Sequence, residues 1–555
     1  MNPARAVTAL RGRASRLADG AHRLLLRGQA AHAWPWVAGL TFIWLAATTW
    51  VYPLLLPDEG RYVGVAWHML ESGEFLTPML DGMPFFHKPP LFYWLTASSL
   101  ALFGANAWAA RLCSVLAATV LVTLFYRFLR VRANARVAGY ATLILAVQPF
   151  LFGASHYANL DMLVGAIIGA TVIAGATAVF RYEQAHPDRG AVLWMYAAAA
   201  LGFLAKGLIG VVLPGGVLFF WLLGRRRFAA MGRLLWWPGI LLFLVLSLPW
   251  MAVMQARHPG FFDYYIVHQH FQRFLESGFN NPHPFWFYVP VLLGLTLPWS
   301  VQLWRWCRRD GPVNPVFVPA AERFEQIDRP VLRGLMLSWL LVILVFFSIP
   351  TSKLVGYVIA ALPPLAWFIA EVFEARAARD RTAAERSLAA SAVIAVLICA
   401  VAVLAMVVVP QPTNKPLARV IAAEAGPGDR LAMLELYAYD VPMIAGRAAP
   451  SIVVSDWDDP GILRSDNWRR ELYDAALFAP EAAREVLWRP AQWHAALCAP
   501  DRPVYWIMAY LKEAPGHPAL EGLAPVASTR RMGLWRVAPD AALSVCGETP
   551  SSVPE

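Results

Sequence analysis

The sequence predicts a polytopic α-helical membrane protein that carries a small α/β domain at its C-terminal end. Of its 555 residues, 58% are hydrophobic and only 15% are charged, and the mean hydropathy is +0.48. So few polar side chains cannot cover the surface of a soluble globule of this size. The apolar residues also gather in runs separated by short Arg clusters, which is typical of helices that cross a bilayer repeatedly.

The net charge of +10 does not indicate a nucleic-acid partner. Its arginines stand between apolar runs, where such clusters set the orientation of helices in a bilayer, so we interpret the basic balance as a topology signal. The Arg-rich residues 1–33 lack a compact apolar core and a small-residue cleavage site. We therefore expect them to form a cytoplasmic N-terminus rather than a cleavable signal peptide.

Apolar runs predict about eleven spans within a membrane domain of residues 34–409, and up to thirteen if Gly207 and Pro214 interrupt helices. The predicted spans are 34–56, 109–125, 137–152, 162–180, 192–205, 208–223, 235–253, 285–303, 331–347, 354–373 and 389–409.

Residues 91–103 are apolar but too few to cross the membrane, and they follow Pro89 and Pro90. We expect this segment to lie flat in the interface, in the first external loop. With that choice, each predicted return to the cytoplasm ends in an Arg cluster, beginning at 127–136. The pattern predicts a cytoplasmic N-terminus and an external C-terminal part.

From residue 410 the composition becomes that of a soluble domain. We predict an external α/β domain over 410–555 and find no catalytic motif in it. Its predicted elements are a helix over 417–424, strands over 431–436, 452–454 and 503–508, and a hairpin over 526–537.

The five cysteines sort by predicted compartment. Cys498 and Cys546 fall in the external domain, where disulfides persist, but the sequence leaves open whether they pair. Cys113, Cys307 and Cys399 fall in spans or on the cytoplasmic side, so we expect them to be reduced or inert.

Charged residues gather near the predicted outer ends of the helices. The set consists of Asp58, Glu59, Arg61, Lys88, Asp161, Lys206, Arg273 and Lys353. Taken alone, Asp58 and Glu59 are better explained as helix caps. Lys88 alone is explained equally well as a side chain that reaches to head groups and as part of a site. Asp161 is different, because a carboxylate that opens an apolar helix is costly without a partner.

Carboxylates and cations on one face suit the transfer of a sugar from a lipid phosphate. Displacement at the anomeric carbon needs a carboxylate to orient or deprotonate the acceptor, and cations to stabilise the departing phosphate. Asp58 and Asp161 fit the first role. Lys88 and Arg273, with Lys206, fit the second.

An aromatic-rich stretch over 261–274 is predicted to form a lipid head-group pocket at the interface. Its His268 and His270, with His87, are also candidate ligands for a divalent metal such as Zn or Mg. Residues two apart do not share a helix face, which argues against a metal site, and we expect no required cofactor.

Several short motifs follow one another along the chain. They are Pro57-Asp58-Glu59-x-Arg61-Tyr62, Phe86-His87-Lys88-Pro89, Tyr157-x-x-x-Asp161, Lys206-Gly207, Pro249-Trp250, His270-x-Gln272-Arg273-Phe274, the aromatic run 285–290, Leu297-Pro298-Trp299 and Lys353-Leu354-x-x-Tyr357. In this order they resemble the aminoarabinose transferases that modify lipid A. Those enzymes are relatives of the protein O-mannosyltransferases within the GT-C class.

The resemblance implies a GT-C fold in a bacterial inner-membrane enzyme whose active site and C-terminus face the periplasm. We expect the protein to be a monomer. It implies transfer of 4-amino-4-deoxy-L-arabinose, or a related amino sugar, from undecaprenyl phosphate to a lipid A phosphate, which confers polymyxin resistance.

By motif, Asp58 and Asp161 are the expected catalytic acids, and Lys88 and Arg273 the expected contacts of the carrier phosphate. The expected cavity-lining residues are Glu59, Arg61, Tyr62, Tyr157, Lys206, His270, Lys353 and Tyr357. His87 stands where the family has an acidic residue. This difference leaves two questions open: whether His87 and His268 bind a metal, and which residue contacts the amine of the sugar.

Three alternatives stay open. A protein O-mannosyltransferase-like enzyme would use a polyprenyl-phosphate sugar on protein hydroxyls and would share the acidic pair. A lipid or solute transporter would place charges near the midplane of repeated halves, whereas these charges gather at one surface and no repeat is evident. A polysaccharide-assembly subunit would not need the cations.

Overall fold

The computed structural model describes residues 33–272, 281–305, 329–464 and 466–546. It divides into two compact units. The first comprises the described parts of Met1–Thr49, Arg111–Met251 and Asn281–Val409. The second comprises those of Trp50–Ala110, Ala252–Asn280 and Pro410–Glu555. One division therefore falls at the predicted boundary before residue 410, while two segments that we assigned to the membrane domain pack with the C-terminal residues.

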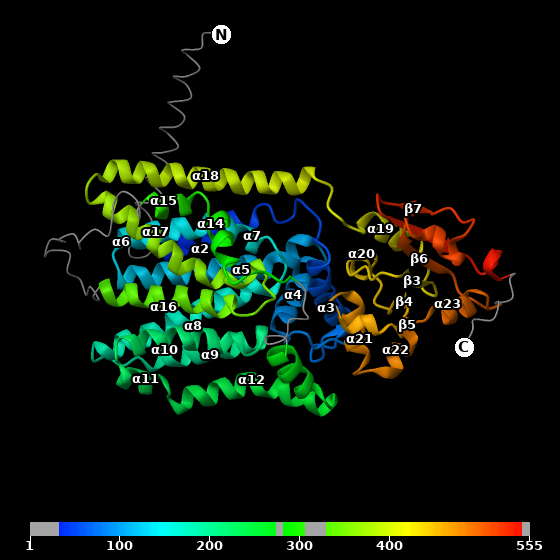
Figure 1. Cartoon of the computed structure of the whole chain (residues 1–555), viewed down its shortest axis with the longest axis horizontal. Helices are drawn as coiled ribbons and strands as arrows, with labels where there is room; N and C mark the ends of the chain where they lie inside the picture. Colours follow the sequence, from blue (N-terminus) through cyan, green and yellow to red (C-terminus); the bar gives the residue numbers. More distant parts are fainter. Residues whose placement is uncertain (1–32, 273–280, 306–328, 465, 547–555) are drawn as a thin grey trace, which may run out of the picture. The chain divides into compact units, whose positions relative to one another are not determined.

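Long apolar helices make up most of the first unit (Figure 1), as the composition predicts for a multi-pass membrane protein. Among the described residues, six helices are long and apolar enough to cross a membrane. They are α5 (Ala107–Arg132), α8 (Leu160–Glu183), α12 (Trp237–Arg257), α16 (Arg329–Ser348), the continuous pair η4 (Val355–Ala361) and α17 (Leu362–Ala377), and α18 (Arg381–Val408). A seventh span would be α6 (Ala135–Ala146) with α7 (Pro149–Ser155), which meet at a bend of 55°.

Some apolar runs that we predicted to be continuous spans are broken. The run 34–56 forms only α2 (Trp34–Ala46), whose 13 residues reach about 20 Å, short of a bilayer's hydrocarbon thickness. The run 285–303 divides into α14 (Tyr288–Leu295) and α15 (Trp299–Arg305). The prediction of eleven uninterrupted spans is therefore wrong. Apolar composition alone does not reveal where a helix ends.

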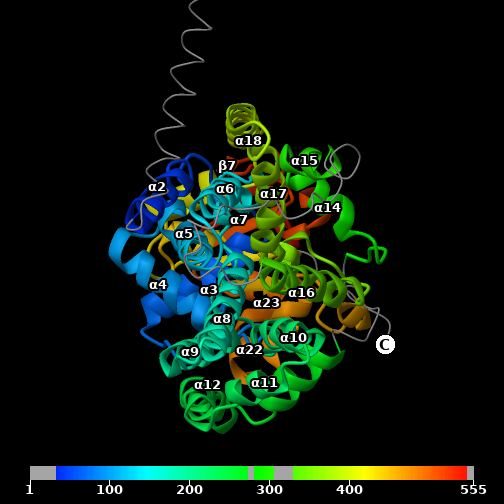
Figure 2. The ribbon, with the colours of Figure 1, turned by 90° about the vertical axis from the view of Figure 1, so that its left-hand side faces the viewer.

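Helices α9 (Arg189–Lys206) and α10 (Ile209–Gly224) pack closely against each other and against α8 (Figure 2). The closest approach is between Gly202 of α9 and Gly210 of α10. A Cβ atom added to Gly210 would lie 2.2 Å from the carbonyl carbon of Gly202. The two helices can therefore pack this closely only because both residues are glycines, which have no side chain. Small residues allow such close backbone contact between helices within membranes. The short α11 (Phe228–Leu234) follows α10.

We expect Gly210→Ala to lower the stability of the protein by about 1–3 kcal/mol, because the new methyl group must push α9 and α10 apart. Gly215→Ala, on the same helix, is the matched control, since nothing lies within 4 Å of its added Cβ. Thermal denaturation of both purified variants in detergent measures the difference. Equal melting temperatures would contradict this account of the interface.

In the second unit, the N-terminal segment contributes α3 (Asp58–Ser72), the strands β1 (Met79–Leu80) and β2 (Met83–Pro84), and α4 (Leu91–Phe103). The 13-residue α4 is the segment that we predicted to be too short to cross the membrane. Residues Asp263–Gln272 form the π-helix η1.

The C-terminal part of this unit is an α/β fold, as predicted. Its six strands stand in the order β5-β4-β3-β6-β8-β7, with β5, β4, β3 and β6 parallel and β8 antiparallel to β6 and β7. The strands are β3 (Arg430–Leu434), β4 (Ile452–Val454), β5 (Leu487–Trp488), β6 (Tyr505–Tyr510), β7 (Ala527–Ser528) and β8 (Met532–Val537). The helices are α19 (Lys415–Glu424), α20 (Val441–Ala445), α21 (Trp468–Ala476), α22 (Pro480–Val486) and α23 (Pro490–Leu497). The predicted helix, strands and hairpin are confirmed within a few residues.

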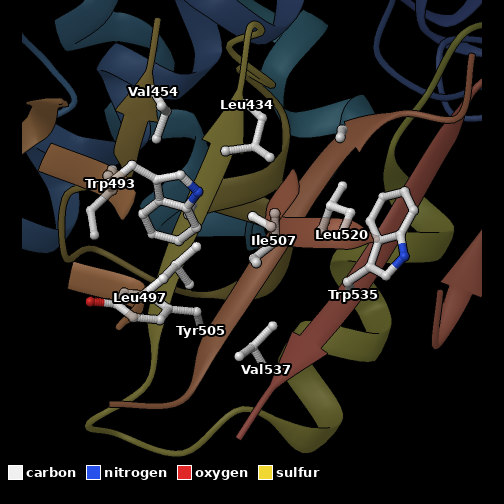
Figure 3. Packing of buried hydrophobic residues seen from close by; sticks show 13 residues of the cluster. Leu434, Val454, Trp493, Leu497, Tyr505, Ile507, Leu520, Trp535 and Val537 are labelled. Atoms are coloured by element: carbon white, nitrogen blue, oxygen red, sulfur yellow. The ribbon is translucent and has the colours of Figure 1, made fainter. Parts of the chain in front are cut away.

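Alternate residues of the strands bury one face of this sheet. Leu434, Val454, Ile507 and Trp535 pack there with Trp493 of α23 (Figure 3). Cys498, just after α23, forms a disulfide with Cys546, which settles the pairing that the sequence leaves open. Cys113 and Cys399 are buried free thiols, and Cys307 lies outside the described residues.

Candidate active site

In the first unit, the structure brings Asp161, Lys206 and Tyr357 together. Asp161 lies in the first turn of α8, where the side chain of Asn159 caps the helix by accepting a hydrogen bond of 3.0 Å from the Asp161 amide. A carboxylate is favoured at this end of a helix. Lys206 is the last residue of α9, where a cation is favoured for the same reason.

The Lys206 ammonium donates to Asp161 Oδ1 over 2.6 Å, and its Nζ lies 4.4 Å from the centroid of the Tyr357 ring. Both charged side chains are largely buried, with 10% of Asp161 and 13% of Lys206 exposed. Each charge would be costly without the other in these apolar surroundings. The two therefore hold the end of α9 against the start of α8.

A small cavity opens beside this pair, lined by Asp161, Lys206, Phe347, Gly356 and Tyr357 among others. The backbone of Gly356 approaches the carboxylate so closely that an added Cβ would lie 2.3 Å from Asp161 Oδ2. Asp161 is thus fixed from one side by Lys206 and from the other by the Gly356 backbone.

In the second unit, Asp58 and Glu59 open α3 and occupy its first turn. Glu59 is buried and accepts a hydrogen bond of 2.6 Å from the Leu55 amide, so this carboxylate turns back to the helix start. Asp58 has 43% of its side chain exposed and accepts a hydrogen bond of 2.5 Å from Arg61. Of the two acids, Asp58 is the one that a substrate can reach.

Arg61 is held by a second carboxylate from the C-terminal part of the same unit. Its guanidinium also donates to Glu471 of α21, which in turn accepts a hydrogen bond of 2.5 Å from the Tyr439 hydroxyl. Burial lowers the pKa of Arg61, but the charge of Glu471 and the other acidic groups outweighs this effect and keeps the pKa above its ordinary value. Tyr62 lies beside this group, with its ring centroid 4.9 Å from the Arg61 guanidinium carbon.

A further network surrounds His87. Its Nε2 lies 3.5 Å from Asp474 Oδ2, and Asp474 also accepts hydrogen bonds from the Tyr264 hydroxyl (3.0 Å) and from Arg470 (3.1 Å). Burial raises the pKa of Asp474, but the close contact with His87, followed by the charge of Arg470, lowers it overall. The Lys88 ammonium donates to the His87 carbonyl over 2.9 Å.

The sequence of the chain matches one family model and several known transferases. The family model described as dolichyl-phosphate-mannose-protein mannosyltransferase matches residues 87–252. The chain is 31% identical over 320 residues to the undecaprenyl phosphate-alpha-4-amino-4-deoxy-L-arabinose arabinosyl transferase of Serratia proteamaculans, covering 57% of this chain and 55% of that one. It is 30% identical over 330 residues to the enzyme of the same name from Pseudomonas aeruginosa strain UCBPP-PA14, covering 58% and 56%. The chain thus spans little more than half the length of these relatives.

A solved structure, ArnT from Cupriavidus metallidurans bound to undecaprenyl phosphate, superposes with a TM-score of 0.74. The two chains are 23% identical, and the superposition covers 94% of this chain and 100% of that one. The apo structure of the same protein superposes with a TM-score of 0.73. The chain has the ArnT fold. The predicted resemblance to the aminoarabinose transferases and their GT-C relatives is confirmed.

Two further residues that the aminoarabinose-transferase resemblance predicts for the site, Lys353 and Tyr157, have contacts that involve backbone carbonyls. Lys353 is 2% exposed and its ammonium donates to the carbonyls of His283 (2.9 Å) and Pro350, so it stabilises the local backbone. The carbonyl of Tyr157 accepts from the Ser114 hydroxyl over 2.8 Å. Arg273 lies outside the described residues, as does the side chain of His270.

The candidate metal ligands have other partners. His87 stacks on Phe85 and faces Asp474, while His268 stacks on Tyr264 and its Nε2 lies 3.2 Å from an Arg470 nitrogen. In the part of the chain that the structure describes, no group of three or more His, Cys, Asp or Glu side chains is placed to hold a metal ion. The described residues therefore do not fit a Zn or Mg site at His87 and His268.

The sequence did not point to Glu471, Asp474, Tyr439 or Arg470. These residues come from an α/β domain without a catalytic motif, and Glu471 lies 410 positions after its partner Arg61. The spacing of Glu471 and Asp474, three residues apart and so on one face of α21, is a weak signal.

Asp81, in the turn between β1 and β2, provides a pH-dependent test of how the second unit packs. It accepts a hydrogen bond of 2.9 Å from the Ser451 amide, and burial raises its pKa to about 7 although Ser451 and Tyr437 oppose this shift. Because the folded pKa is raised from the ordinary 3.8, ionisation destabilises the fold increasingly as the pH rises from about 4 to about 7.

We expect Asp81→Asn to stabilise the protein by about 1–3 kcal/mol at pH 8 and by less at pH 5, because an amide has no charge to bury. Asn also tolerates the positive φ of 50° at this position. Thermal denaturation at the two pH values measures the effect, with the exposed Asp540→Asn as control. A gain that does not depend on pH would contradict the burial of the Asp81 charge.

Proposed function

We propose that the protein transfers 4-amino-4-deoxy-L-arabinose, or a closely related amino sugar, from undecaprenyl phosphate to a phosphate of lipid A on the periplasmic side of the bacterial inner membrane. The observation that carries the proposal is the Asp161–Lys206 pair, fixed at the start of an apolar helix in a chain with the ArnT fold. The names of the aminoarabinose transferases that it resembles supply the donor and the sugar.

The proposed reaction is a displacement at the sugar's anomeric carbon. The bond from this carbon to the carrier's phosphate oxygen breaks, and its electron pair leaves with undecaprenyl phosphate. An oxygen of the lipid A phosphate forms the new bond. Where the acceptor phosphate still carries a proton, that proton passes to a carboxylate.

The exposed Asp58 suits the contact to the acceptor, since its ion pair with Arg61 orients the carboxylate. The buried Asp161 suits a fixed electrostatic role beside the reacting sugar, with Lys206 balancing its charge. Lys88 and Arg273 remain the proposed contacts of the carrier's phosphate.

A protein O-mannosyltransferase-like activity is the second candidate, favoured by the family model that matches residues 87–252. It would use the same kind of polyprenyl-phosphate donor but a protein hydroxyl as acceptor. Labelled sugar that appears in protein and not in lipid A would favour this candidate over the first.

We expect Asp58→Ala and Asp161→Ala each to lower sugar transfer to lipid A by about 100-fold or more, the usual contribution of a positioned acid or base. The measurement is the mass of lipid A from a strain that has no aminoarabinose transferase of its own and produces each variant. Membrane content and melting temperature control for folding. Unmodified lipid A with the wild-type protein, or fully modified lipid A with both variants, would refute the proposed function.

Gly356→Ala tests the fixed position of Asp161 without changing a charged residue. The added methyl group would lie 2.3 Å from Asp161 Oδ2, so the carboxylate must turn away or lose its contact with Lys206. We expect transfer to fall about tenfold, the cost of a misplaced catalytic group. Gly153→Ala is the control because nothing lies within 4 Å of its added Cβ, and transfer by it should match wild type.

A further inference from the structure

We propose that Glu471 and Tyr439, from the C-terminal α/β part of the second unit, position the carboxylate of Asp58 by holding Arg61 in place. The inference rests on the proposed function, because that function gives Asp58 its role. It assigns the C-terminal domain a part in the reaction, although none of its residues has to touch a substrate.

The contacts form a chain with one exposed end. Arg61 donates with one nitrogen to Asp58 Oδ1 over 2.5 Å and with another to Glu471 Oε1. The exposed fraction of the side chain falls from 43% for Asp58 to 18% for Arg61 and 3% for Glu471. A solvent-accessible carboxylate is therefore tied, through a guanidinium, to a carboxylate that cannot move into solvent.

Glu471 is itself held at both oxygens. The Tyr439 hydroxyl donates to Oε2 over 2.5 Å, while Arg61 occupies Oε1. Glu471 also lies in the first turn of α21, which Asn467 caps by accepting from the Arg469 and Arg470 amides. The helix dipole favours the Glu471 carboxylate at that position. A flexible Arg side chain bound to so rigid a partner loses most of its rotamer freedom.

Tyr439 comes from the segment that follows β3, at the carboxyl end of the parallel strands. In open α/β sheets this edge is where ligands bind. Here its neighbouring helix α20 packs against α3, the helix that carries Asp58 and Arg61. The edge of the sheet at which such domains usually bind ligands thus contacts α3, the helix that carries Asp58 and Arg61.

Carboxylate labelling of Asp58 tests this role independently of sugar transfer. The full-length protein in detergent is treated with a water-soluble carbodiimide and glycine ethyl ester, and mass spectrometry measures modification of the Asp58 peptide. We expect Glu471→Gln to label about threefold faster or more, because a neutral partner holds Arg61 less firmly. Asp458→Asn, which breaks the exposed ion pair with Arg489, should label like wild type.

Transfer to lipid A gives the second readout, expressed per folded molecule. We expect Glu471→Gln to slow transfer about tenfold, equivalent to the loss of one charge-assisted hydrogen bond. Because Glu471 acts through Arg61, adding Glu471→Gln to Arg61→Ala should slow transfer no further. If Glu471→Gln does not fold, Tyr439→Phe replaces it, with a smaller effect in the same direction.

The two readouts separate the possible failures. Asp58 labelling that does not change in Glu471→Gln overturns the positioning role, whatever the transfer assay gives. An equal loss of transfer with and without Arg61 also overturns it, because Glu471 would then act on stability alone. Wild-type protein that transfers no sugar to lipid A overturns the proposed function and leaves the labelling result to decide the positioning role.

Discussion

A carboxylate that opens a helix next to apolar surroundings has to be paired with a cation, and much of the described site follows from this constraint. Asp161 begins α8 and Lys206 ends α9, so their ion pair can form only if the two helices run antiparallel with these ends together. The helix dipoles favour both charges where they stand. The same pairing recurs at α3, where Asp58 and Arg61 share the first turn, but there a third charge, Glu471, is needed to fix the cation.

The fold could be predicted from the sequence wherever one kind of residue dominates a long enough stretch. Apolar runs predicted α8, α12, α16 and α18, and alternation with turn residues predicted β4 and the β7–β8 hairpin. The run 34–56 was predicted wrongly as one helix. Composition did not distinguish α2 from the irregular apolar chain after it, because the residues that follow Ala46 are also mostly apolar.

The site could be predicted only where its residues stand at the ends of apolar runs. Asp161 and Lys206 were recognisable because a charged side chain at the end of an apolar run is energetically costly unless it has a partner or a function. Lys353 stood at a similar position, yet its ammonium is bound to backbone carbonyls, a role that its sequence context cannot distinguish from that of a cavity-lining residue. Glu471 and Asp474 were missed for the opposite reason: acids on an amphipathic helix of a soluble domain look like ordinary surface residues until the tertiary structure buries them.

That burial bears on why a multi-pass membrane protein would carry a domain without a catalytic motif. If Asp58 contacts the acceptor as proposed, packing cannot hold its carboxylate directly without blocking that substrate. A relay solves this conflict, since Arg61 reaches from the buried Glu471 to the exposed Asp58 and leaves the acceptor's side of the carboxylate open. A sheet with Tyr439 at its carboxyl edge and α21 beside it supplies rigid elements on which such a relay can be anchored.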